Sequence, residues 1–579
     1  MRWRRPPFAA RFLVVAVAAH AHLVPPPREL FDGAGVAVAE LADASISGGR
    51  KPELPCAAPV QRARVEFPEH LIIGDAADGV EMYSGYVNVT SEDYLFYWFM
   101  EADSGAPDDA PLIIWTNGGP GCSSMEGVTT EHGPLVLFGI KEDSMVSPAK
   151  LSRNPYAWNR EAHVLYVDQP RYVGFSCGTG PFLTSSVAAG LDMVNFIRGW
   201  HNLFPEHAHR DVILAAESYG GHFIPAWSSA ILDYNSAGVA EPIRLTGLII
   251  GNGIVNETIQ GRTFPEFAKR QGLIPKNLSV ESSWGAREIM TDYIGYEPNY
   301  YDYRLAEHGC CGCSAYNYKY WSDFMMREDV TKALNVCGDA GAKAFGGCAA
   351  GCIQLPAFDK NDLFSYSGAI ARALEQGIQV TFYYGMQDTA CNYVGGYAMA
   401  EMLEWHGSEH FRAAPMEDLI VGGIPAGGQK AFGGLTWIQI EGAGHMVPIN
   451  NPAAAYHAVG TLVRARRGQS REGPAAVPPQ WGGRGGHAPL PTSLDTPRIS
   501  EWMDRLSPLI PHTEVVYRLG IFGLLGLLSP LLVAAAVATQ RYGGPWAAAV
   551  HFRRRPAAFG YSRGVSDRFG PDQLLEADL

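Results

Sequence analysis

The feature that most constrains the fold is an apolar run that stops at a serine. Residues 211–217 read Asp-Val-Ile-Leu-Ala-Ala-Glu and predict a buried strand, while residues 221–234 are compatible with a helix. Ser218 stands between them, with Ala216 two residues before it and Gly220 two residues after it. Small residues at these positions permit a tight strand-to-helix turn that exposes the serine oxygen. The pattern therefore predicts a nucleophilic serine at the end of a strand.

Other apolar runs of strand length accompany this one. They cover residues 111–116, 163–168, 245–251, 379–385 and 435–441. Each is apolar almost throughout, as expected for strands that are covered on both faces. Alternation of such strands with helical patterns predicts an α/β chain with a mostly parallel central sheet and helices on both faces.

One of the helical patterns spans residues 185–204, with Ser185 or Ser186 as its N-cap. Its apolar residues at helical spacing are Val187, Leu191, Val194 and Ile197. Residues 254–325 break the strand–helix alternation, because they carry clustered tyrosines and cysteines. We expect this segment to be a cap insertion that covers one end of the sheet.

Two further polar residues follow predicted strands. Asp388 comes just after the strand at 379–385, and His445 just after the strand at 435–441. The chain order Ser, Asp, His is that of α/β-hydrolases, in which ligands bind at the carboxyl edge of the sheet. His445 would accept the proton of Ser218 and return it to the leaving group, while Asp388 would orient the imidazole and stabilise the imidazolium.

A glycine-rich loop follows the first of these strands, with the sequence Trp-Thr-Asn-Gly-Gly-Pro-Gly-Cys-Ser-Ser at 115–124. A phosphate-binding loop is the alternative interpretation, but no Gly-Lys-Ser/Thr follows the glycines. Its place after an early strand suits the second backbone donor of an oxyanion hole.

Together these segments resemble the serine carboxypeptidases, the family of carboxypeptidase Y. The similar stretches lie at residues 115–124, 154–159, 167–176, 217–225, 251–253, 385–392 and 442–448, within a region of about 80–465. The resemblance implies an α/β-hydrolase fold and a serine-type carboxypeptidase that removes the C-terminal residue of peptides through an acyl-enzyme. It implies no cofactor.

The resemblance also implies roles for single residues. Ser218, Asp388 and His445 match the catalytic triad, and the N–H groups of Gly119 and Tyr219 match the oxyanion hole. The residues that match the site for the substrate's free carboxylate are Trp115, Asn117, Gly118, Glu131 and Glu217. Two carboxyl groups can bind a carboxylate only if at least one of them is protonated and donates, so we expect an acidic pH optimum. The positions that depart from the family pattern are Ala216, Met386, Arg171 and Cys177.

The N-terminus predicts export. Residues 1–21 combine arginines, a short apolar run and an Ala-His-Ala cleavage site, which is typical of a signal peptide. Residues 22–66 resemble a leader or propeptide, and residues 67–467 form the predicted catalytic domain. Ten cysteines fit an oxidising lumen. Three sequons agree with this compartment, at Asn88, Asn256 and Asn277.

The C-terminal part of the chain predicts a membrane anchor. Residues 468–516 are rich in Gly and Pro and suggest a lumenal stalk. The predicted transmembrane helix is 517–541, because residues 519–539 carry no charge, and an arginine-rich cytosolic tail follows at 542–579. We therefore expect a type I single-pass protein of the secretory pathway, in the Golgi, the vacuole or at the cell surface.

The cysteines and one histidine pair raise the question of metal. Cys122 resembles a half-cystine whose partner is Cys348 or Cys352, and Cys391 resembles a free thiol at the edge of the active site. The even cysteine count favours disulfides over metal for Cys310, Cys311, Cys313 and Cys337. The zinc-like pattern between His406 and His410 is interrupted by Gly-Ser, which disfavours the long helix that such a motif needs. We expect no metal.

Two alternatives to a carboxypeptidase stay open. An acyltransferase would form the same acyl-enzyme and differ only in its acceptor, and a non-catalytic lumenal binding or chaperone protein would not react with a fluorophosphonate. The expected partners are peptide or protein C-termini and, through the predicted span, the membrane. The excess of 59 acidic over 45 basic residues gives a net charge of −14 and disfavours a nucleic-acid partner.

Overall fold

The computed structural model describes residues 59, 61–103, 106, 109–137, 149–280, 283–307, 316, 318–337, 358 and 362–466. The chain divides into two compact units, Met1–Arg484 and Gly485–Leu579, and every described residue belongs to the first. The fold given below is that of the first unit.

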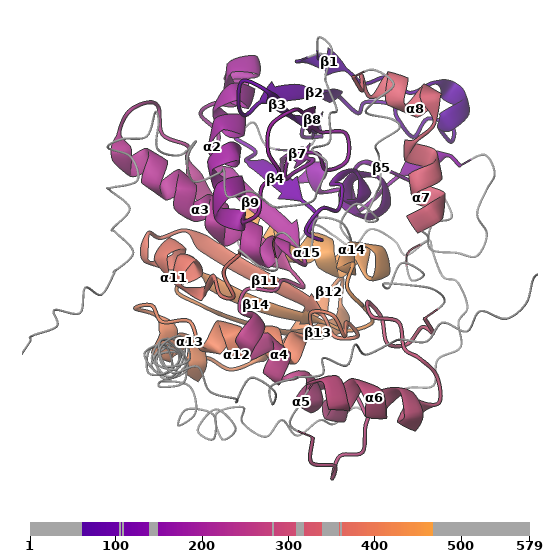
Figure 1. The fold of residues 1–579 in the computed structure, drawn as a ribbon, viewed down its shortest axis with the longest axis vertical. Helices are drawn as coiled ribbons and strands as arrows, with labels where there is room; N and C mark the ends of the chain where they lie inside the picture. Colours follow the sequence, from indigo (N-terminus) through magenta and orange to yellow (C-terminus); the bar gives the residue numbers. More distant parts are fainter. Residues whose placement is uncertain are drawn as a thin grey trace, which may run out of the picture. The chain divides into compact units, whose positions relative to one another are not determined.

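Six parallel strands form the centre of its sheet (Figure 1). In spatial order they are β7 (His163–Val167), β4 (Leu112–Thr116), β9 (Val212–Glu217), β10 (Leu245–Gly251), β11 (Gln379–Gly385) and β14 (Leu435–Ile440). All six predicted strands are confirmed to within one residue at each end. Their side chains are almost all buried, which agrees with a sheet covered on both faces.

Antiparallel strands extend the sheet at both edges. Beyond β7 lie β3 (Asp93–Met100), β2 (Met82–Asn88) and β1 (Ala63–Arg64), and β8 (Cys177–Gly178) pairs with β3. Beyond β14 lie β13 (Ile424–Phe432) and β12 (Glu417–Val421). A separate two-stranded sheet joins β5 (Leu135–Leu137) to β6 (Leu151–Arg153). None of these strands was predicted from the sequence.

Helices α2 (Ser186–Leu203) and α3 (Gly220–Ala237) pack against each other, and α11 (Ser367–Glu375) packs beside α3 (Figure 1). Ser185 is the N-cap of α2, because its side chain accepts a hydrogen bond from the N–H of Ala188. The buried face of α2 differs from the predicted one. Val194 and Ile197 are buried as predicted, but Val187 and Leu191 are 50% and 38% exposed. The bulky side chains of Met193, Phe196 and Trp200 are fully buried instead.

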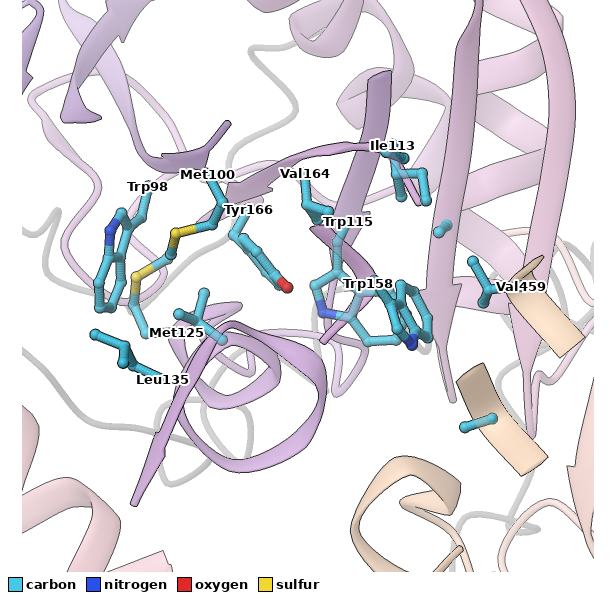
Figure 2. Packing of buried hydrophobic residues seen from close by; sticks show 14 of the residues in the cluster. Trp98, Met100, Ile113, Trp115, Met125, Leu135, Trp158, Val164, Tyr166 and Val459 are labelled. Carbon is cyan, nitrogen blue, oxygen red and sulfur yellow. The ribbon is translucent and has the colours of Figure 1, made fainter. Parts of the chain in front are cut away.

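Helix α15 (Pro452–Arg466) contributes Val459 and its neighbours to a large apolar core. Figure 2 shows part of this core, in which Val459 lies near Ile113 and the rings of Trp115 and Trp158. The Trp115 ring meets that of Trp158 edge-on at 5.2 Å between centroids. Burying such large apolar surfaces is the main favourable term in folding, and here it also fixes a tryptophan that belongs to the candidate site.

Several helices lie in the described part of the chain between β10 and α11. It contains α4 (Glu257–Arg262), α5 (Phe264–Arg270), α6 (Ser283–Ile294), α7 (Tyr318–Met325) and α8 (Glu328–Ala333), so described helical structure continues past residue 325. The remaining helices are α12 (Tyr393–Glu401), α13 (Ser408–Ala413) and α14 (Val447–Asn450). Short helical turns occur at Glu69–Leu71, Gly127–His132, Trp158–Arg160 and Pro205–His207.

Within the described part of the chain, no helix combines the length and the apolar character needed to cross a membrane. The predicted signal peptide, stalk, transmembrane helix and cytosolic tail all lie outside the described residues.

Candidate active site

Ser218 occupies the predicted turn between a strand and a helix. Strand β9 ends at Glu217, helix α3 begins at Gly220, and Ser218 has a φ of 60°, in the left-handed region that residues with side chains rarely adopt. The turn is closed by two hydrogen bonds of 3.0 Å, from Gly221 N to Ser218 O and from Ser218 N to Gly251 O. The serine is partly exposed and can therefore meet a substrate.

The glycine-rich loop lies directly against this turn. A Cβ atom on Gly118 would be 2.5 Å from the backbone nitrogen of Tyr219 and 2.8 Å from Cβ of Ser218, so only glycine permits this approach. Within the described residues, no acceptor takes a hydrogen bond from the N–H of Gly119 or of Tyr219. Both donors are therefore available for an oxyanion beside Ser218.

Asp388 and His445 form the predicted pair. His445 Nδ1 lies 2.7 Å from Asp388 Oδ2, and the side chains are 3% and 0% exposed. Asp388 also accepts hydrogen bonds from the backbone N–H groups of Ala390 (2.8 Å) and Cys391 (3.2 Å). A carboxylate held in this way keeps the imidazole in one orientation and leaves its other nitrogen for proton transfer.

Asn252 is a further partner of Asp388 that the sequence analysis did not assign. Its Nδ2 donates to Asp388 Oδ2 at 2.8 Å, and its Oδ1 accepts from Gly385 N at 3.0 Å. Asn252 follows β10 directly and is fully buried. The signal was present in the Gly-Asn-Gly stretch at 251–253, which stands at the carboxyl end of a predicted strand like the triad residues.

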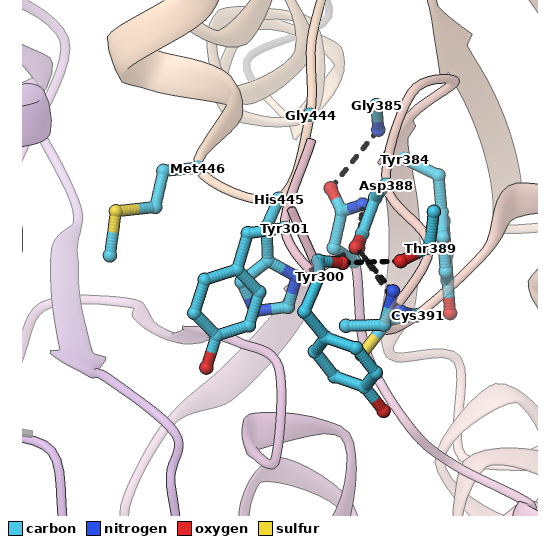
Figure 3. Close-up of polar contacts among 12 residues, drawn as sticks. Tyr300, Tyr301, Tyr384, Gly385, Asp388, Thr389, Cys391, Gly444, His445 and Met446 are labelled. Atoms are coloured by element: carbon cyan, nitrogen blue, oxygen red, sulfur yellow. Dashed lines mark hydrogen bonds and ion pairs between the residues drawn. The ribbon is translucent and has the colours of Figure 1, made fainter. Parts of the chain in front are cut away.

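The thiol of Cys391 lies beside the pair. Cys391 is free, as predicted, and buried, and Figure 3 shows it close to Asp388 and Thr389. Ligand-type atoms of Asp388, Cys391 and His445 lie within 4.8 Å of one another. Burial raises the pKa of this thiol well above its ordinary value, and the contact with Ser218 only partly offsets that effect. Metals bind the thiolate, so burial disfavours the form of Cys391 that a metal ligand would need.

Four of the five residues predicted to bind a carboxylate form one buried hydrogen-bond network, and the fifth, Gly118, follows Asn117 in the chain. Trp115 Nε1 donates to Asn117 Oδ1 at 2.7 Å. Asn117 Nδ2 then donates to Glu217 Oε1 at 2.9 Å and to Glu131 Oε1 at 3.3 Å. The two carboxyl groups can also share a hydrogen bond with each other. Apart from that, the other oxygen of each glutamate is buried and has no hydrogen-bond partner within the described residues. Unsatisfied buried oxygens of this kind call for an explanation such as a missing ligand.

The two glutamates are poorly ionised. Burial raises the pKa of Glu131 to about 7. Burial, together with the negative charges of Glu131 and Glu126, raises the pKa of Glu217 well above its usual range. At acid pH the pair therefore holds at least one proton, and a protonated carboxyl can donate to an incoming carboxylate.

Glu126 is a third buried carboxyl that the sequence analysis missed. It is 2% exposed, and burial, aided by the charge of Glu131, raises its pKa well above the usual range. It precedes the helical turn Gly127–His132, which carries Glu131. Asn154 holds that turn, because its Nδ2 donates to the carbonyl oxygens of Glu131 (3.2 Å) and Gly133 (3.0 Å).

Two of the departures from the family pattern, Arg171 and Cys177, take part in defined contacts. Arg171 is buried between two carboxylates, with Nε 2.6 Å from Asp192 and Nη1 2.8 Å from Asp93. Cys177 is disulfide-bonded, as is Cys122. The candidate partners of Cys122, Cys348 and Cys352, lie outside the described residues, as do Cys310, Cys311 and Cys313.

The predicted sequons lie at different kinds of position. Asn88 and Asn277 are exposed. Asn256 is half-buried, caps α4 by accepting from Ile259 N, and donates from Nδ2 to Ser365 at 2.9 Å.

The two histidines of the zinc-like pattern are separated by the start of a helix. His406 lies before α13, and its Nδ1 is 2.9 Å from Glu375 Oε2. His410 lies inside α13 and stacks on Phe432 at 4.9 Å. The long shared helix that such a motif requires is not formed.

Comparison with known proteins agrees with this geometry. The serine carboxypeptidase family, peptidase family S10, matches residues 74–289 and 288–465. Carboxypeptidase Y homolog A of Botryotinia fuckeliana is 33% identical over 423 residues, which cover 65% of this chain and 72% of that protein. Carboxypeptidase Y of Candida albicans is 31% identical over 418 residues, with 65% and 72% covered.

A solved structure has the same fold. Kex1Δp, a prohormone-processing carboxypeptidase from Saccharomyces cerevisiae, superposes with a TM-score of 0.57 at 22% identity. The match covers 69% of this chain and 95% of that one. The central sheet with its helices is thus an α/β-hydrolase fold.

Proposed function

The chain belongs to the serine carboxypeptidase family and is a serine carboxypeptidase, and we propose that Ser218, His445 and Asp388 carry out its reaction. Ser218 Oγ attacks the last peptide carbonyl while His445 takes its proton. Asp388, 2.7 Å from His445 Nδ1, stabilises the imidazolium that results. The imidazolium then protonates the leaving amino acid, and water hydrolyses the acyl-enzyme by the same route in reverse.

The oxyanion formed in each step is bound by backbone N–H groups. The proposed donors are the N–H groups of Gly119 and Tyr219. They lie near each other because the glycine-rich loop contacts the Ser218 turn at Gly118. Removing one oxyanion-hole donor typically slows a hydrolase by about 10²–10³. A side chain at position 118 would push the loop away from Ser218 and Tyr219, and so would separate the two donors.

The observation that carries the exopeptidase assignment is the buried carboxyl pair beside the nucleophile. Glu217 directly precedes Ser218, and Glu131 shares with it the amide of Asn117. Apart from the hydrogen bond that the two carboxyl groups can share, one oxygen of each glutamate has no partner among the described residues. A terminal carboxylate would accept from the protonated pair and from the backbone N–H of Gly118, while Asn117 holds the two glutamates in place. This arrangement would place the last peptide bond, and no internal bond, at Ser218.

Binding through a protonated pair predicts a preference for acid conditions. Glu131 loses its proton as the pH rises through about 7, which places one negative charge beside the substrate carboxylate. Glu217, whose pKa is also raised well above its usual range, adds a second charge when it loses its own proton at higher pH. We therefore propose a pH optimum on the acid side of neutral for peptides with a free carboxylate.

We also propose that the enzyme works in the lumen of the secretory pathway as a type I membrane protein. The disulfide-bonded Cys122 and Cys177 support an oxidising compartment. The exposed sequon residues Asn88 and Asn277 are sites where a glycan could be attached. The uncharged stretch at 519–539, followed by arginines, supports the anchor.

The proposed function is tested by following a peptide and its C-terminal amide by mass spectrometry. Wild-type enzyme should shorten the free acid by one residue at a time and leave the amide far less affected. Ser218→Ala should reduce cleavage at least about a thousandfold with the fold intact, because the acyl-enzyme cannot form. Internal cleavage of both peptides, or a loss of only about tenfold in the variant, would contradict the assignment.

A further inference from the structure

A short segment of the insertion contacts the loop that carries Asp388. Thr389 Oγ1 donates to Tyr300 O at 2.6 Å, and Tyr303 N donates to Gln387 O at 3.2 Å. Figure 3 shows Tyr300 and Thr389 side by side in this contact. The segment, residues 299–304, thus ties the insertion to the residues on either side of the triad aspartate.

The same segment contacts the loop that carries His445. His445 N donates to Tyr301 O at 2.8 Å, and Arg304 Nη2 donates to Gly442 O at 3.3 Å. A Cβ atom on Gly444 would lie 2.4 Å from Tyr301 O, so the loop and the segment touch at a position that only glycine permits. Residues 299–304 therefore bridge the two loops that hold the acid and the base.

Internal hydrogen bonds fix the shape of the segment. Asn299 is fully buried, and its Oδ1 accepts from Tyr301 N at 2.8 Å and from Asp302 N at 3.2 Å. Arg304 binds both oxygens of Asp302, at 2.8 and 2.5 Å. These hydrogen bonds fix the backbone at Tyr301 and so restrict where its ring can lie.

That ring stacks on the catalytic imidazole. The ring centroids of Tyr301 and His445 are 4.5 Å apart, with an interplanar angle of 17° (Figure 3). Aromatic faces carry negative potential and attract a cation placed over them. A ring in this position restrains the plane of the imidazole and interacts more strongly with its protonated form.

We propose that Tyr301 is a positioning residue for His445, holding the imidazole toward Ser218 and stabilising the imidazolium that forms during the reaction. The proposal rests on the triad roles given above. The insertion would then take part in proton transfer. Asp388 would orient the imidazole of His445 by binding its Nδ1, and Tyr301 would orient it by stacking on its face.

Other titratable or charged groups also surround His445. Asp388 and the thiol of Cys391 face it from the loop after β11. Tyr316 packs beside Tyr301, at 6.2 Å between rings, and its hydroxyl accepts from Met446 N at 3.1 Å. The Asp302–Arg304 pair lies behind Gly444 and Gly442. Arg287, which packs on Tyr300 at 4.6 Å, donates to Thr389 O. These groups stay in place when only the ring at 301 is changed.

The test follows the rate of Ser218 labelling by a fluorophosphonate as a function of pH. This probe has no terminal carboxylate and no leaving amino acid, so the rate does not report the glutamate pair. The variants are Tyr301→Leu, which removes the ring, and Tyr301→Phe, which keeps it. Tyr293→Leu is the matched control, because Tyr293 is 55% exposed on α6.

Tyr301→Leu should be labelled about tenfold more slowly at neutral pH. The acid limb of its plot of labelling rate against pH should move to lower pH by about half a unit, as expected for loss of one aromatic–cation contact. Tyr301→Phe and Tyr293→Leu should behave as wild type. The midpoint of the limb does not depend on how much of a preparation is folded, so partial misfolding of the leucine variant would not hide the result.

Two outcomes would overturn the proposal. One is a Tyr301→Leu variant whose labelling rate and acid limb equal those of wild type. The other is a Tyr301→Phe variant that loses as much labelling rate as Tyr301→Leu. Failure of the proposed function has a different signature. In that case wild type and Ser218→Ala would be labelled alike, and the role of Tyr301 would fall with the triad.

Discussion

A Cβ atom at position 220 would lie 2.2 Å from the Cβ of Ala216, so Gly220 and Ala216 face each other across the turn that carries Ser218. Two side chains cannot share this space. The family pattern has glycine two residues before the serine, whereas this chain has Ala216. The turn can therefore form only if residue 220 carries no side chain.

Gly220→Ala should therefore destabilise the protein by about 1–3 kcal/mol, as overpacking of a tight site does, and reduce activity. Ala216→Gly in the same chain should restore much of both, because the clash is between these two Cβ atoms alone. Thermal unfolding and peptide turnover of the single and double variants measure this. Equal losses with and without Ala216→Gly would show that the contact is not the cause.

Asn252→Leu should lower kcat by about tenfold with little change in KM. The side chain donates to Asp388 at 2.8 Å and does not belong to the network around Glu131 and Glu217. Removing one donor leaves the carboxylate less firmly placed against His445, which affects proton transfer more than substrate binding. Steady-state kinetics with a free-acid peptide distinguish the two parameters. A rise in KM at constant kcat would assign Asn252 to binding instead.

A cluster away from the site should govern part of the stability at acid pH. Glu101 lies 2.8 Å from His163 and 3.3 Å from His207; burial raises its pKa, but the two histidine hydrogen bonds outweigh that and lower it to about 2. Its ionised form then stabilises the fold above pH of about 4.5, and this contribution is lost as the pH falls toward 2.

Glu101→Gln should accordingly cost about 2 kcal/mol at pH 7, with the difference from wild type narrowing below about pH 5. Melting temperatures between pH 7 and pH 3 give the comparison, with the exposed Glu409→Gln as control. If the difference in melting temperature between wild type and Glu101→Gln stays constant over this range, the charge of Glu101 does not contribute to stability.

The topology prediction is tested by ending the chain at residue 467. The truncated protein should be secreted in soluble form with its peptidase activity kept, because all the described secondary structure precedes that residue. The full chain should stay with membranes through a carbonate wash. Membrane retention of the truncated chain would contradict a single C-terminal anchor.

The sequence alone predicted the parallel centre of the sheet because β7, β4, β9, β10, β11 and β14 are buried on both faces and read as unbroken apolar runs. Strand β3 carries a similar run and was within reach of the same reasoning. Strand β13 was not, since proline, glycines and a lysine give it little strand preference, and its pairing with β14 supplies the structure.

For the site, Ser218, Asp388 and His445 could be predicted because each follows a strand, and parallel strands bring such residues to one edge. Glu131 came only from the family resemblance, since its local sequence is that of an ordinary carboxylate. The contact of Tyr301 with His445 depends on how the insertion packs, which no periodicity in the sequence encodes.

The central claim is that a protonated Glu131–Glu217 pair recognises the free carboxylate of the substrate, and KM measured against pH tests it most directly. For a free-acid peptide, wild-type KM should begin to rise above pH of about 7, where Glu131 loses its proton, and should rise further where Glu217 loses its own, by up to about tenfold per pH unit. Glu131→Gln combined with Glu217→Gln keeps amide donors at every pH and should flatten that rise, whereas Glu409→Gln should not. An equally steep rise in the double variant would contradict the account.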